Sequence, residues 1–116
     1  MKLEEFYRQA GGSYEDVHAR FQSDERVLRF LRLFAGDDSM DSLTAAVERN
    51  DPEGAFRGSH TLKGVALNLG LTALAAASSD LTEALRGKAV LPERALYERV
   101  LLEYRRVRAA LDELEA

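Results

Sequence analysis

The sequence contains no cysteine. Without thiols, the chain can form neither disulfide bonds nor thiolate metal sites, and it has no cysteine nucleophile. This composition fits a reducing compartment, so we expect a cytoplasmic location. Stability must then come from the packing of hydrophobic side chains, which make up 46% of the 116 residues.

Long hydrophobic runs are also missing. Among the longest is Leu71–Ala77, which is far shorter than the ~20 residues that a membrane-spanning helix needs. The N-terminus, MKLEEFYRQAGG, is charged and amphipathic where a signal peptide would need an uninterrupted apolar segment. We therefore expect a soluble protein that is neither exported nor bound to a membrane.

The chain also lacks an excess of positive charge. Its formal net charge is −4. Nucleic acids and anionic membranes attract basic patches, so we expect neither as a partner. The run Arg105–Arg108 is interpreted as a solvated face near the C-terminus of a helix, where cations complement the helix dipole. No second histidine lies three or four residues after His18 or His60, so no metal site is predicted.

The sequence does show helical periodicity almost throughout, with no sustained alternation of the kind that strands show. Its length suits one domain. Leu3, Phe6, Tyr7 and Ala10 predict a first short helix that Gly11-Gly12 ends. Ser13, followed by Asp16, predicts the cap of a second short helix, with His18 at the edge of its apolar face.

Longer helices follow these two. Asp24 is expected to cap a helix that ends at Gly36, and Ser39 a helix that ends at Asn50; the two could form one bent rod. Asp51-Pro52 is a strong helix start, because aspartate can accept free N–H groups and proline has none to leave unpaired.

Gly70 should end that helix in a left-handed conformation. Thr72 is expected to cap the next helix, which stops near Gly87, and Leu91-Pro92 to open the last one. The predicted fold is all-α: an antiparallel four-helix bundle over residues 23–116, with the short helices of residues 1–22 packing at one end.

The stretch GSHTLKGVALNLG, residues 58–70, carries unusual residues on one side of its helix. At about 100° per residue, a buried stripe centres on Leu62 and includes Ala55, Gly58, Ser59, Val65, Ala66 and Leu69. His60 lies about 160° from Leu62, so its imidazole should point at solvent.

Several residues share this outer face. Phe56, Gly64 and Leu67 lie within about 40° of His60, and Arg57 and Lys63 lie about 60° to either side. Cations would stabilise a dianionic group on the imidazole, the glycine would leave room for a partner, and the apolar residues would supply a docking surface. Phe56 could instead lie beneath the N-terminal helices.

This pattern resembles a known family. His60-Thr-Leu-Lys63-Gly64, followed by Asn68-Leu69-Gly70, is similar to the HxxKG(x5)G signature of histidine-containing phosphotransfer (HPt) domains of bacterial two-component phosphorelays. The four-helix layout expected around it is also the layout of that family.

The resemblance implies a phosphocarrier rather than an enzyme. His60 would accept a phosphoryl group on Nε2 from the aspartate of one receiver domain and pass it to the aspartate of another. Lys63 would pair with the phosphoryl oxygens, Gly64 would keep the approach open, Asn68 would lie at the lower edge of the contact surface, and Gly70 would be structural. The partners would be response-regulator receiver domains or a hybrid histidine kinase. Mg²⁺ would belong to the receiver, so this chain needs no cofactor.

Two alternatives remain open from the sequence. A helical docking or adaptor module would bind receiver domains without carrying phosphate. A dimerisation bundle that presents His60 to a separate kinase ATPase domain would be an obligate dimer, whereas we expect a monomer. Met1 and the complete domain suggest a free-standing protein, and a fragment of a hybrid kinase is the alternative.

Overall fold

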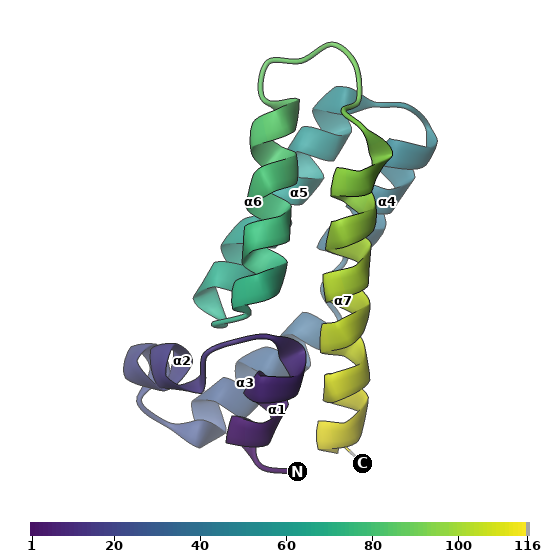
Figure 1. Ribbon diagram of the computed structural model, residues 1–116. Coiled ribbons are helices and arrows are strands. Elements are labelled where there is room, and N and C mark those ends of the chain that lie inside the picture. The colour runs from purple at the N-terminus through teal and green to yellow at the C-terminus, as the bar shows by residue number, and fades with distance from the viewer. Residues whose placement is uncertain (116) are drawn as a thin grey trace.

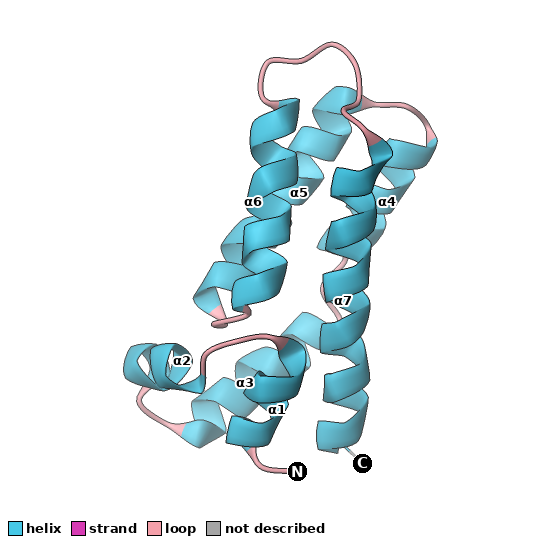
Figure 2. Ribbon diagram, in the orientation of Figure 1, coloured by secondary structure: helices cyan, strands magenta, loops and turns pink. Residues whose placement is uncertain are grey.

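The computed structural model describes residues 1–115, and these form an all-helical protein with no strand among them (Figure 2). Seven helices follow one another along this part of the chain. Their bounds are α1 Leu3–Ala10, α2 Tyr14–Phe21, α3 Asp24–Ala35, α4 Ser39–Glu48, α5 Pro52–Asn68, α6 Thr72–Leu85 and α7 Arg94–Glu115. The all-α prediction is therefore confirmed.

The sequence correctly predicted where the first short helix ends and where the second begins. Gly11 ends α1 with φ 75°, in the left-handed region that favours glycine. The side chain of Ser13 accepts a hydrogen bond from the backbone N–H of Asp16 across 3.1 Å at the start of α2.

At two other helices the N-cap is the residue just before the one that was predicted. Ser23, not Asp24, caps α3: its backbone is extended and its hydroxyl accepts from the N–H of Arg26 at 3.3 Å. Thr72 lies inside α6, where its hydroxyl donates to the carbonyl of Gly70 at 3.4 Å instead of accepting from the helix. A cap must keep an extended backbone just outside the helix, and sequence alone does not decide which of two neighbours does so.

Two further starts differ from the prediction. Ser39 is the first residue of α4, and its N–H donates to the Asp37 carboxylate at 2.8 Å. The last helix begins at Arg94, two residues beyond Leu91-Pro92. The suggestion of one bent rod is wrong, because α3 and α4 are separate helices divided by residues 36–38.

The helices form two groups along the molecule (Figure 1). Helices α4, α5, α6 and α7 lie side by side, with α5 packed against α4 and α6, and α6 packed against α7. Helices α1, α2 and α3 gather at the end where both termini lie. Helix α7 joins the groups, because it packs against α6, α1 and α3.

Polar contacts of α7 correct the interpretation of residues 105–108 as a simple solvated face. The Arg106 side chain donates to the carbonyl of Gln9, just before the end of α1, across 2.6 Å. The Arg108 side chain donates to the carbonyl of Ala35, the last residue of α3, across 2.9 Å. Two arginines of this run therefore link α7 to α1 and α3 by hydrogen bonds, while Arg105 is exposed.

One hydrophobic core runs through both groups. It includes Phe6 and Tyr7 of α1 as well as Leu62 of α5, all almost inaccessible to solvent. In the part of the chain that the structure describes, no helix combines the length and the apolar character that crossing a membrane requires.

Candidate functional site

Capping residues define both ends of helix α5. The Asp51 carboxylate accepts from the N–H of Gly54 at 2.9 Å, and Pro52 is the first helical residue. At the other end, Gly70 has φ 69°, and the N–H of Leu71 reaches back to the carbonyl of Ala66 across 2.9 Å. This is the hydrogen bond of a Schellman motif, and it ends the helix as predicted.

The buried stripe of α5 lies where the periodicity placed it. Ala55, Gly58, Ser59, Leu62, Ala66 and Leu69 are buried, while Val65 is half-buried. His60 is exposed on the opposite side. Its ring and the ring of Phe56 form an edge-type aromatic pair, with 5.9 Å between the centroids. The face that carries His60 therefore points outward.

Gly64 and Leu67 share this outward face. A Cβ placed on Gly64 would meet no atom within 4 Å outside its own helix, so a side chain would project into open space. Leu67 keeps 52% of its surface exposed. Lys63 is half-buried on the flank. We call His60, Lys63, Gly64 and Leu67 the His60 face.

Gly58, by contrast, is a glycine that packing requires. A Cβ at this position would lie 3.0 Å from the Cα of Leu43 in α4. The two glycines of the GSHTLKG stretch thus differ: Gly58 allows α4 and α5 to approach closely, whereas no contact within the described chain explains Gly64.

Phe56 lies beside the His60 face and not under the N-terminal helices. Its half-buried ring contacts His60 on one side, and the guanidinium of Arg86 lies 5.1 Å from its centroid. This distance is within the range of a cation–π contact. The alternative that placed Phe56 beneath the first two helices is therefore wrong.

Arg57 and Asn68 are exposed at the two ends of this region. The Arg57 side chain pairs with Glu53 one turn earlier, at 2.9 Å. The backbone carbonyl of Asn68 accepts from the Arg20 side chain of α2 at 2.7 Å, and the Asn68 side chain stays exposed. These residues therefore flank the His60 face, and their side-chain and backbone partners are Glu53 and Arg20, not His60.

A family model described as the Hpt domain matches residues 31–116. The chain belongs to the Hpt domain family. No curated protein and no solved structure shows significant similarity to it. The matched range covers the signature helix α5 and its neighbours, and Hpt domains act as phosphocarriers, not kinases, in two-component phosphorelays.

Sequence reasoning missed two residues beside the His60 face: Glu83 in the last turn of α6 and Arg86, the residue that follows this helix. Glu83 and Arg86 form an ion pair at 2.8 Å, and Arg86 also covers Phe56. The hydrogen bond from Arg86 lowers the pKa of the Glu83 carboxyl, and the charges of Lys63 and His60 act in the same direction. The i,i+3 spacing of Glu83 and Arg86 indicated a helix-surface ion pair, but only packing shows which neighbour it faces.

The second histidine of the Hpt chain lies elsewhere. His18 is exposed on α2, with its ring 5.4 Å from that of Tyr14 and its Nε2 4.0 Å from the Asp24 carboxylate. Within residues 1–115, no group of three potential ligands among histidine and acidic side chains is placed to hold a metal ion.

Proposed function

We propose that His60 accepts a phosphoryl group from the aspartyl phosphate of one receiver domain and donates it to the aspartate of another. One observation carries this proposal: in a member of the Hpt family, an exposed histidine shares an outward helix face with a lysine and with a glycine that no packing contact explains. Transfer between proteins needs this combination of access and charge.

The proposed step exchanges one bond for another. Nε2 of His60 attacks phosphorus, the bond to the aspartyl oxygen breaks, and the aspartate leaves as a carboxylate. The Nδ1 proton of the ring passes to water as the ring returns to neutrality. Passing the group to the second receiver reverses these steps, with the acceptor carboxylate as nucleophile.

The surroundings of His60 suit this chemistry because phosphoryl transfer depends mainly on positioning and on charge stabilisation. Lys63 would pair with the phosphoryl oxygens, since it lies one turn from His60 on the same side. Gly64 would leave the line of attack open. Phe56, Arg57, Leu67 and Asn68 would contact the receiver, and Gly70 would hold the end of α5.

The proposed carrier is a cytoplasmic monomer. Residues 23–116 would form its antiparallel four-helix bundle, with α4, α5, α6 and α7 as the long elements, and residues 1–22 would be an N-terminal addition. Mg²⁺ and the remaining catalytic groups would be supplied by the receiver. Light scattering tests the monomer: a dimer at micromolar concentration would favour a histidine kinase dimerisation bundle instead.

The decisive experiment uses receiver domains of the same organism, each phosphorylated with labelled phosphate in the presence of Mg²⁺. We expect label on the wild-type chain that survives base and is lost in acid, as a phosphoramidate requires. His60→Gln should take no label, while the matched control His18→Gln should take as much as the wild type. Receiver binding with no label on the wild-type chain would contradict the proposal and favour a docking module.

A further inference from the structure

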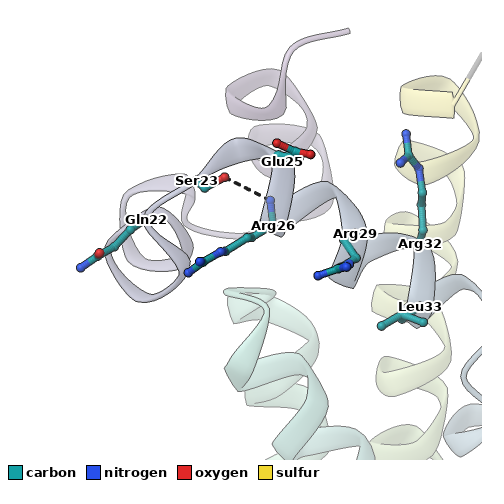
Figure 3. Close-up of a pocket in the computed structure, with 7 residues that line it drawn as sticks. All are labelled: Gln22, Ser23, Glu25, Arg26, Arg29, Arg32 and Leu33. Atoms are coloured by element: carbon teal, nitrogen blue, oxygen red, sulfur yellow. Dashed lines mark hydrogen bonds between the residues drawn. The ribbon is translucent and has the colours of Figure 1, made fainter.

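The outer side of α3 carries arginines that the proposed transfer does not use. A surface hollow of about 830 Å³ is lined by residues of this helix and of the turn before it, including Arg26, Arg29 and Leu33. Figure 3 shows Arg26 and Arg29 extending to the same side of α3, where Leu33 also lies, while Arg32 and Glu25 point elsewhere. We call Arg26, Arg29 and Leu33 the α3 face.

The two arginines of the α3 face have unused hydrogen-bond donors. Neither guanidinium lies within 4.0 Å of a carboxylate among residues 1–114, although most arginines of the other helices are paired, as Arg99 is with Asp80 at 2.7 Å. Both side chains are exposed. In a chain with a net charge of −4, this is a local positive surface that attracts carboxylates.

The α3 face adjoins the flank of the His60 face at Asn68. Leu33, which is 64% exposed, lines the arginine hollow and also a second, smaller hollow. That second hollow is bordered by Val65 and Asn68 of α5. Asn68 follows His60 by eight residues, or about 12 Å along the helix axis. Leu33 therefore bridges the lower edge of the proposed transfer site and the arginines.

The size of a protein interface makes this distance significant. A stable complex typically buries about 800 Å² on each partner, which corresponds to a patch of about 30 Å across. A receiver centred on His60 would extend about 15 Å in each direction, so it would reach Asn68 and the hollow that Asn68 shares with Leu33. The lining of this hollow is mostly polar and exposed, unlike the enclosed apolar walls of small-molecule sites.

We infer that the α3 face is the second half of the receiver-docking surface, where Leu33 packs against an apolar side chain and Arg26 and Arg29 pair with carboxylates of an acidic receiver surface. This inference rests on the proposed function. Residues of α3 would then determine which receiver domain binds, whereas His60 of α5 would carry the phosphoryl group. Charges at the rim of an interface act mainly on the rate of association, so the effect should depend on salt.

The test compares charge-reversed variants in transfer from the receiver that labels the wild type fastest. Arg26→Glu with Arg29→Glu should lower kcat/KM about tenfold at low salt, through KM, and the deficit should shrink as salt is added. The matched control, Arg8→Glu with Arg105→Glu, makes the same change of charge at exposed positions outside both hollows and should stay within twofold of the wild type. Circular dichroism melting checks that each variant folds, and Arg26→Gln with Arg29→Gln serves as a milder pair.

The apolar contact has its own matched pair. Leu33→Ala should raise KM several-fold, whereas Leu102→Ala, at an equally exposed leucine of α7, should not. Labelling by phosphoramidate, a small donor that needs no docking surface, should be the same in all variants.

The two proposals fail in different ways. If the wild type takes label from a receiver and the α3 variants match it at low salt, the docking surface is refuted and the carrier function stands. If no receiver labels the wild type, both are refuted.

Discussion

The hydroxyls of Thr82 and Ser59 lie within hydrogen-bond distance, 2.9 Å apart, in the buried layer between α6 and α5, and the Thr82 hydroxyl also lies 2.7 Å from the carbonyl of Ser78. The Ser59 hydroxyl also lies 3.2 Å from the carbonyl of Phe56. Both hydroxyl-bearing residues are inaccessible to solvent, and Ser59 directly precedes His60. This contact therefore joins α5 and α6 directly beneath the exposed His60.

Replacing Thr82 with valine keeps the shape of the side chain but removes the hydroxyl. The Ser59 hydroxyl then loses its partner in α6, which we expect to cost about 1–3 kcal/mol of unfolding free energy. Urea denaturation measures the loss. Thr61→Val, on the exposed side of α5, is the matched control and should change stability by less than about 0.5 kcal/mol. Equal losses in the two variants would contradict a special role for the buried pair.

Gly64 offers a way to separate stability from function. Gly64→Gln replaces glycine with a better helix former in open space, so we expect a gain of about 0.5–1 kcal/mol in unfolding free energy. The longer side chain would stand beside His60, and transfer from a receiver should fall at least tenfold while labelling by phosphoramidate continues. A variant that is more stable and still transfers at the wild-type rate would show that the open space is not needed.

Gly58→Ala should have the opposite effect on stability. Its new Cβ would press on the backbone of Leu43 at 3.0 Å, and overpacking of this kind costs about 1–3 kcal/mol. The urea midpoint should drop. A midpoint at or above that of the wild type would mean that α4 can move away from α5 without loss.

Tyr7 links the N-terminal region to the end of the signature helix. Its buried hydroxyl donates to the carbonyl of Leu69 at 2.7 Å. Tyr7→Phe would leave that carbonyl without this donor, which we expect to cost about 1–3 kcal/mol at neutral pH. Burial raises the pKa of the Tyr7 phenol above its ordinary value.

The raised pKa gives this contact a pH dependence. Above pH 10, an unfolded chain releases the phenol proton while the folded chain retains it, so the folded state binds more protons and stability falls as pH rises. The contribution is fully present below about pH 10 and is lost above it. Unfolding curves from pH 7 to 11 should show a shallower alkaline loss for Tyr7→Phe than for the wild type. Parallel curves would contradict this assignment.

Removal of residues 1–22 should destabilise the rest of the chain. The segment contributes buried side chains to the common core, and each is worth about 1.5–3 kcal/mol, or less for alanine. These are Leu3, Phe6, Tyr7, Ala10 and Val17. We expect the melting temperature to fall by more than about 10 °C, whereas removal of Met1 alone should leave it unchanged, because the carbonyl of Lys2 still accepts the N–H of Phe6 at the start of α1. Unchanged melting after the larger deletion would show that the segment is dispensable.

Much of the fold was predictable because helix signals are local. Periodicity of 3.6 residues predicted which side of α5 is buried, and the termination of α1 and α5 at Gly11 and Gly70 follows from their left-handed backbone. Caps were less certain where two neighbours could serve, as with Ser23 and Asp24. The choice between them depends on the path of the chain before the helix.

Tertiary structure decided the rest of the candidate site. The sequence does not show what an outward-pointing side chain faces. The position of Arg86, just after α6, over Phe56 and the nearness of Leu33 to Asn68 are therefore known only once the helices pack. Nor did the charged run of α7 reveal that Arg106 and Arg108 reach neighbouring helices. The helices and the outward direction of His60 could be predicted from the sequence alone, because each depends on the geometry of a single helix. Contacts between helices decided its neighbours, because they depend on packing between segments far apart in the chain.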